Sequence, residues 1–175
     1  MKIFRIFSLL SLMLLQACAN PSIVSVRENM LSDIPPQAVI FVPRFEGNPN
    51  FVEESTDFFV ANLERSVKNR VVQGSVLRQE STDIISGGNL APVEIALKVS
   101  RERDYDLLIM GKVSSHSTMG TLNGFSTIRI YDVTTGERIA NFHRPSGLLM
   151  AYSEHQCVMA AVERTAKDSA SIFNH

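Results

Sequence analysis

The chain has 175 residues and a formal net charge of −1, with 45% hydrophobic and 20% charged residues. This length suits one domain with a substantial core. With nine glycines and two cysteines, the composition excludes a collagen and a disulfide-rich miniprotein, and it does not fit a coiled-coil rod or a disordered tail. The near-neutral charge gives no support for a nucleic-acid binder, which would need a basic stripe.

Residues 1–17 have the features of an export signal. Lys2 and Arg5 precede an apolar run, Ile6–Leu15, that is too short to span a bilayer as a permanent helix. The sequence Leu-Gln-Ala-Cys, which closes at Cys18, resembles a bacterial lipobox. The resemblance implies cleavage before Cys18, a diacylglyceryl thioether on its sulfur and an acylated amine. The alternative is an ordinary secretory signal with an incidental cysteine.

The residues around the lipobox predict where the protein resides. Ala19 rather than an aspartate follows Cys18, which in enteric-type bacteria implies the outer membrane. Several acyl chains hold a protein on a membrane stably, where one chain would not. We therefore expect a lipid anchor on the periplasmic face of the outer membrane. Cys157 is then a single thiol in an oxidising compartment, either buried or paired between chains, and burial is favoured.

The mature chain divides into a proline-containing tether, residues 18–36, and a single globular domain, residues 37–175. Hydrophobic periodicity and turn residues define the elements of that domain. In chain order we predict a buried strand (38–43), a loop (44–50), a helix (52–69), a short strand (70–73), a segment that fits a short helix only ambiguously (75–86) and a helix (91–103). These are followed by a central strand (107–113), a hairpin-like loop (120–124), a strand (125–133), a tight turn (134–137), a return strand (138–143) and a final helical segment from residue 148 onward.

These elements have the order β-α-β-(α)-α-β-β-β-α, which predicts an α/β (α+β) domain with helices packed on a mixed β-sheet. The early βα segments need crossover connections, and the last three strands are expected to form an antiparallel meander. The final helix carries a stripe of small residues, among them Ala161 and Ser169. A stripe of this kind allows the helix to lie close against a sheet.

Three segments together resemble one superfamily of periplasmic lipoprotein domains. They are the opening strand Val39–Pro43, the acidic-aromatic turn and strand Arg103–Val113, and the strand and turn Ile128–Gly136. The superfamily includes the curli secretion channel lipoprotein (CsgG), the Pel polysaccharide lipoprotein (PelC), the flagellar lipoproteins of the FlgO type and the amino-terminal domain of TolB. The resemblance covers most of residues 38–172. The chain lacks the amphipathic hairpins that build the curli channel's barrel, so we do not expect it to form a pore alone.

The resemblance implies a non-enzymatic accessory or assembly subunit of an envelope machine for secretion, polysaccharide export, or flagella or other appendages. Its expected partners are the membrane, reached through the lipid, an envelope protein complex, and further copies of the chain in a ring or other homo-oligomer. The alternative is a monomeric periplasmic lipoprotein that binds a small molecule or a glycan. No nucleic-acid partner is expected.

The sequence offers no constellation for catalysis, and we predict no enzyme activity, cofactor or metal. The serines around His116 lack the Gly-x-Ser-x-Gly elbow of a hydrolase. His155 and Cys157 are two residues apart in a helix, and this spacing points them away from a common metal.

Two loops are candidates for a partner surface because each combines aromatic residues with glycine and asparagine. Aromatic residues are enriched at protein interfaces, although loops also bury them at the edge of a core. The candidate interface residues are Phe45, Asn48 and Phe51 in the first loop and Leu122, Asn123 and Phe125 in the second.

The lipobox generates the first testable prediction. Cys18→Ser removes the sulfur that would carry the thioether, so the precursor should stay uncleaved or be mislocalised. Metabolic labelling with a fatty-acid probe, combined with membrane fractionation, measures this. Lipid labelling of the serine variant at the level of the parent protein would contradict the prediction.

Overall fold

The computed structural model describes residues 22–32, 34–74, 92–118, 121–147 and 153–174. The ambiguous segment at 75–86 lies outside these residues. In chain order the elements are β1 (Ile23–Val26), α2 (Glu28–Leu31), β2 (Ile40–Val42), β3 (Glu46–Gly47), α3 (Pro49–Ser66), β4 (Val71–Gln73), α4 (Pro92–Glu102), β5 (Leu107–Thr118), β6 (Thr121–Asp132), β7 (Arg138–Pro145) and α5 (Glu154–Ile172).

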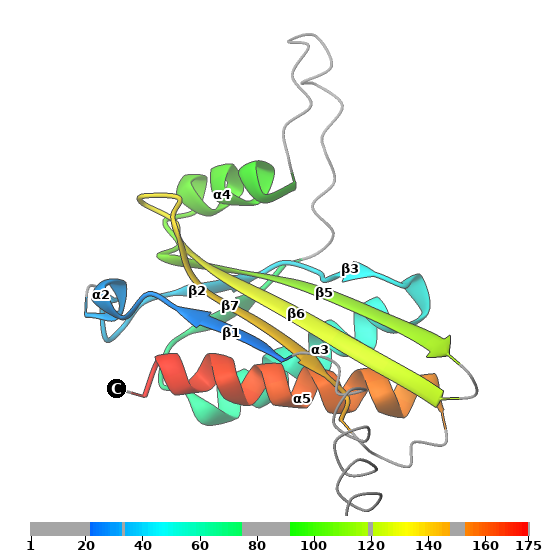
Figure 1. The fold of residues 1–175 in the computed structure, drawn as a ribbon. Coiled ribbons are helices and arrows are strands. Elements are labelled where there is room, and N and C mark those ends of the chain that lie inside the picture. The colour runs from blue at the N-terminus through cyan, green and yellow to red at the C-terminus, as the bar shows by residue number, and fades with distance from the viewer. Residues whose placement is uncertain (1–21, 33, 75–91, 119–120, 148–152, 175) are drawn as a thin grey trace, which may run out of the picture.

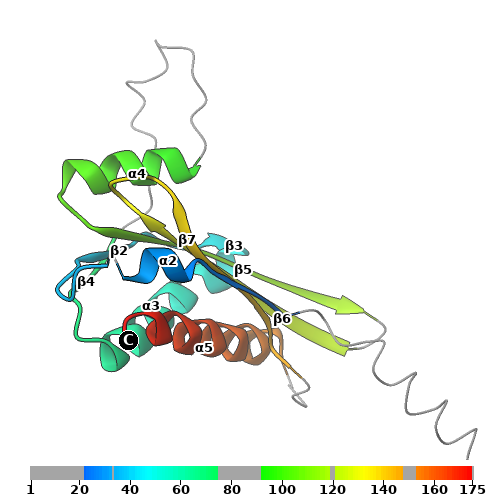
Figure 2. The same cartoon turned by 60° about the vertical axis from the view of Figure 1, so that its left-hand side comes forward.

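The described strands form one mixed, seven-stranded sheet with the order β1-β7-β6-β5-β2-β4, and β3 pairs with β5 (Figure 1). β2 runs parallel to β4 and β5, while β5, β6 and β7 form an antiparallel meander. Helices α3 and α5 cover one face of this sheet, and α4 lies on the opposite face at one end (Figure 2). The predicted fold class, with crossovers first and a meander after them, is confirmed.

Two hydrophobic clusters lie on the two sides of the sheet because neighbouring residues of a strand point to opposite faces. In β5, Ile109 belongs to the larger cluster under α3 and α5, together with Phe59 and Val162. Its neighbour Leu108 belongs to the smaller cluster under α4, together with Leu97. The sheet is thus thickly covered on one side and covered at one end on the other.

Helix α5 packs unusually close to β6, as its small residues predict. A Cβ atom built on Gly124 would overlap the backbone of Cys157 and Val158. Two residues along β6, the hydroxyl of Ser126 lies 2.8 Å from the hydroxyl of Thr165 in α5, and both side chains are fully buried. Small side chains on both elements therefore let the helix backbone rest directly on the strand.

The structure differs from the predicted tether at residues 18–36. Ile23–Val26 forms β1, which pairs antiparallel with β7, and the side chain of Val26 packs against the larger core cluster. The following α2 adds Met30 and Leu31 to the same cluster. A four-residue strand near prolines gives almost no periodicity in the sequence, and its position depends on the otherwise unpaired edge of β7.

The structure also differs from the predicted loop at residues 120–124. Strands β5 and β6 continue to Thr118 and Thr121 and pair along their whole length, for example Ser117 with Leu122. The hairpin consequently runs beyond the neighbouring strands (Figure 2). Its serine-rich sequence lacks the apolar alternation of a strand, but one side of the hairpin rests on α5, and this contact supplies the burial that the pattern does not predict.

None of the described helices is both long enough and apolar enough to cross a membrane.

Shortening a buried side chain of the central strand β5 to alanine should destabilise the fold, whichever face of the sheet the side chain lies on. Leu108 and Ile109 are both 0% exposed, so each change to alanine should lower the free energy of unfolding by about 2–5 kcal/mol. Urea titration measures the change. Ser114→Ala, at an exposed position of the same strand, is the control and should stay within about 0.5 kcal/mol of the parent. Parental stability in both core variants would show that this strand is not central.

Burial should also make the Cys157 thiol unreactive. The residue is 1% exposed and forms no disulfide, and its Sγ donates to the carbonyl oxygen of Leu122 at 3.5 Å. In a Cys18→Ser chain, a maleimide should label Cys157 slowly under native conditions and fully in denaturing urea. Labelling at the same rate in both conditions would show that α5 does not seal this site.

Candidate functional site

The face of the β5–β6–β7 meander that turns away from α5 carries the candidate site. Helix α4 covers this face only near Leu108 and Val133, where the smaller core cluster lies. Farther along the strands the outward positions hold half-buried or exposed polar, charged and aromatic side chains, such as Lys112, Thr127 and Arg129. An outward sheet face with few aliphatic side chains has the composition of a solvent-facing or ligand-facing surface.

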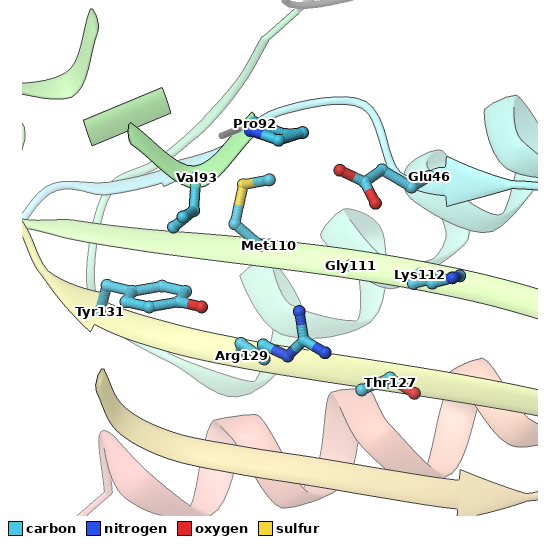
Figure 3. A pocket seen from close by; sticks show the side chains of 9 residues that line it. All are labelled: Glu46, Pro92, Val93, Met110, Gly111, Lys112, Thr127, Arg129 and Tyr131. Carbon is cyan, nitrogen blue, oxygen red and sulfur yellow. The ribbon is translucent and has the colours of Figure 1, made fainter. Parts of the chain in front are cut away.

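A pocket of about 240 Å³ opens where the first turn of α4 meets β3, β5 and β6 (Figure 3). Its walls combine charged, hydroxyl-bearing and apolar side chains. The lining residues are Glu46, Pro92, Val93, Met110, Gly111, Lys112, Thr127, Arg129 and Tyr131.

Two cations form one side of this pocket. Backbone pairing sets Met110 opposite Arg129 and Lys112 opposite Thr127, so Lys112 and Arg129 are diagonal neighbours on the same face. Within the part of the chain that the structure describes, no hydrogen bond or ion pair engages either side chain. Like charges on adjacent strands repel each other. The pair therefore has an electrostatic cost, and no ion pair among the described residues offsets it.

Glu46 lines the same pocket from strand β3. Strand β3 runs parallel to β5 and sets Glu46 beside Lys112 in register. Figure 3 shows the carboxylate of Glu46 and the guanidinium of Arg129 entering the pocket from opposite sides. The Glu46 carboxylate, like the two cations, has no hydrogen bond or ion pair among the described residues. The pocket thus holds two cations and one carboxylate, and the carboxylate lies on the strand beside Lys112 and across from Arg129 (Figure 3).

The remaining wall is apolar and firmly packed. Val93, Met110 and Tyr131 are half-buried and pack against the smaller core cluster. The hydroxyl of Tyr131 points toward Arg129 (Figure 3). Because the core holds these side chains in place, the wall is formed before any ligand arrives.

A ladder of three stacked rings continues from the pocket toward the hairpin. The rings of His116 and Phe125 have centroids 5.1 Å apart and planes 5° apart, and those of Phe125 and His143 are 5.7 Å and 12° apart. The Oγ1 of Thr127, a lining residue of the pocket, lies 2.8 Å from Nδ1 of His143. Sequence reasoning missed this ladder because its rings come from three strands, and the strand register alone brings them together.

The first predicted interface loop does not expose its first aromatic residue. Phe45 is 4% exposed, packs against Phe59 with ring centroids 5.2 Å apart, and lies over Gly111, which leaves room for its ring. The prediction for Phe45 is therefore wrong. Asn48 is the N-cap of α3, its side chain accepts a hydrogen bond from the backbone of Asn50 at 3.0 Å, and the helix consequently begins before the predicted residue 52.

The other predicted interface residues lie in regular structure rather than in loops. Phe51 is half-buried in the first turn of α3, with its ring 6.4 Å from that of His155. Leu122, Asn123 and Phe125 are half-buried positions of β6, and Phe125 is the middle ring of the ladder. Cys18 lies outside the described residues.

The described residues contain no group of three histidine, cysteine or acidic side chains that would hold a metal. His155 instead lies 2.8 Å from Glu54, and the thiol of Cys157 is buried. Ser115 and His116 are neighbours in β5 and point to opposite faces, so they do not form a nucleophile and base pair. The acidic turn before β5 is structural, since Asp106 accepts a hydrogen bond from the Val39 amide at 2.7 Å.

One ion pair fixes α5 to the meander from the covered side. Nε of Arg144 lies 2.6 Å from a carboxylate oxygen of Asp168, and a second guanidinium nitrogen lies 3.1 Å from the other oxygen. Hydrogen bonding to Asp168 raises the pKa of Arg144. This bidentate pair holds α5 against the sheet. It does not involve the side chains of the sheet face that carries the pocket.

A scan against protein-family models finds no match, and neither does a search of curated protein sequences. Among solved structures, the PelC dodecamer from Paraburkholderia phytofirmans has a TM-score of 0.54 at 14% identity and covers 89% of this chain and 98% of its own. A point variant of the same PelC has a TM-score of 0.54 at 11% identity and covers 89% and 100%. A hypothetical protein from Chlamydia trachomatis has a TM-score of 0.49 at 11% identity and covers 78% and 98%.

At these identities the likeness concerns the fold. It agrees with the resemblance that the three sequence segments carry. Over 89% of its length, this chain has the fold of the lipoprotein domain PelC.

Proposed function

We propose that this chain is a lipid-anchored accessory subunit of an envelope assembly, that it resides on the periplasmic face of the outer membrane, and that it works as a homo-oligomer without catalysis. The observation that carries the proposal is the PelC fold, because the PelC of known structure is a dodecamer. The lipobox that ends at Cys18 supports the location. A fold supports a function by analogy, so the machine that the subunit serves is left open.

The short segment between the anchor and the sheet supports attachment close to the membrane. Cys18 precedes the first residue of β1, Ile23, by five residues. Five residues extend at most about 18 Å. A lipid on Cys18 would therefore hold the β1 edge of the sheet near the bilayer and confine all subunits to one plane.

The two ends of the sheet support assembly from head to tail. Within the described residues, the sheet ends in β1 on one side and in β4 on the other. Edge strands present unpaired backbone groups that a further chain can use, and Ile23 and Val24 of β1 are each 49% exposed. A ring needs two different patches of this kind. Tethering raises the effective concentration, so a contact that is weak in solution suffices on the membrane.

A monomeric lipoprotein that binds a small molecule is the second candidate function. The pocket at Lys112 and Arg129 favours it, because a preformed cavity with converging polar groups is typical of ligand sites. Ligand binding by itself is compatible with assembly, since the pocket lies on the face of β5 and β6 and not at either end of the sheet.

Crosslinking in the envelope tests the assembly. A photoreactive residue at Val24 in β1 or at Gln73 in β4 should give a ladder of homo-oligomers in the lipidated, full-length protein. The exposed position Glu64 on α3 is the control and should give none. If neither sheet end crosslinks to another copy, while both crosslink to unrelated proteins, the subunit is a monomeric adaptor.

A further inference from the structure

We propose that the pocket between α4, β3, β5 and β6 binds a small acidic sugar of the hexuronate class. Lys112 and Arg129 would hold the carboxylate, and the ring would lie against the apolar wall. This inference is independent of the lipid anchor and of the oligomer, because every residue involved belongs to one copy of the chain.

The unpaired cations provide the argument for an anion. Lys112 and Arg129 are diagonal neighbours, and no ion pair engages them among the described residues. A carboxylate between them would remove their mutual repulsion. A guanidinium group matches a carboxylate geometrically because it donates two parallel hydrogen bonds to the two oxygens.

The carboxylate of Glu46 argues against a compact polyanion. The Glu46 carboxylate enters the same pocket from the side facing Arg129 (Figure 3). It would repel the second charge of a phosphate group, whereas it would accept hydrogen bonds from neutral hydroxyl groups. Thr127 and Tyr131 add two more hydroxyl partners. The polar groups therefore fit one negative charge at one end of the ligand and several hydroxyls along it.

Size and the apolar wall complete the identification of the ligand class. A volume of about 240 Å³ is below the roughly 300–1,000 Å³ of sites for drug-sized ligands, so the pocket suits a single sugar ring. Val93, Met110 and Tyr131 present carbon surface to one side of the pocket. A pyranose ring has a C–H face that packs on such a surface, and a free inorganic anion has none.

Isothermal titration calorimetry on the full-length protein in detergent tests the proposal, with glucuronate as the ligand, and with glucose and inorganic phosphate as comparisons. Glucuronate should bind, and glucose and phosphate should each bind at least about tenfold more weakly. Raising the salt concentration should weaken glucuronate binding, because both cations are exposed. Absence of glucuronate binding, or equal binding of glucose or phosphate, would overturn the proposal.

Variants locate the site. Arg129→Gln and Lys112→Gln should each weaken glucuronate binding by at least a factor of about ten. Glu46→Gln should bring the affinities for glucuronate and phosphate closer together, because it removes the carboxylate that repels phosphate. Arg65→Gln is the matched control, since it removes an exposed arginine of α3, which lies on the other side of the sheet (Figure 2), and the affinity of this variant should equal that of the parent. Equal effects of Arg129→Gln and Arg65→Gln would show that the binding is general charge attraction.

A second readout does not depend on the stability of the variants. With methyl-labelled methionine in the unmodified protein, glucuronate should shift the NMR signal of Met110, which lines the pocket. The signal of Met159, which packs against the larger core cluster on the other side of the sheet, should stay in place. A shift of Met159 without one of Met110 would overturn the assignment of the site.

Discussion

The architecture depends on the close contact between α5 and β6 at Gly124. A side chain at this position would overlap the helix backbone at Cys157 and Val158. Gly124 is not among the residues with positive φ, so its backbone conformation does not demand glycine and the approach of the helix does. Next to it, the buried hydroxyl pair Ser126–Thr165 satisfies two polar groups between strand and helix. The face of the β5–β6 hairpin that meets α5 is thus in direct contact with the helix backbone.

The contact of one face of β6 with α5 determines which side chains lie on the opposite face. Side chains alternate along β6, so the small or aliphatic residues that meet α5, such as Ser126 and Ile128, force Phe125, Thr127 and Arg129 onto the opposite side. Helix α4 covers one end of that side only. Charged groups therefore gather at the edge of α4, where they line the pocket, and the rings of the ladder lie farther along the strands toward the hairpin.

Local patterns in the sequence predict the covered half of the molecule well and the open half poorly. The small-residue stripe of α5 and the alternation around Ile128 are contained in short segments, so both are recognisable before the fold is known. Glu46 and Lys112 lie far apart in the sequence and meet only because β3 pairs with β5. Phe45 is misassigned for the same reason, since its partner Gly111 belongs to a distant strand.

The free energy of unfolding of Gly124→Ala tests the central contact most directly, because the two possible outcomes have opposite signs. If α5 rests on the β6 backbone as described, the added methyl group must push the helix away. The variant should then lose about 1–3 kcal/mol of stability in a urea titration. If the helix lies farther from the strand, alanine fits without strain and reduces the entropy of the unfolded chain. Stability would then rise by about 0.4–1 kcal/mol, and that result would contradict the account.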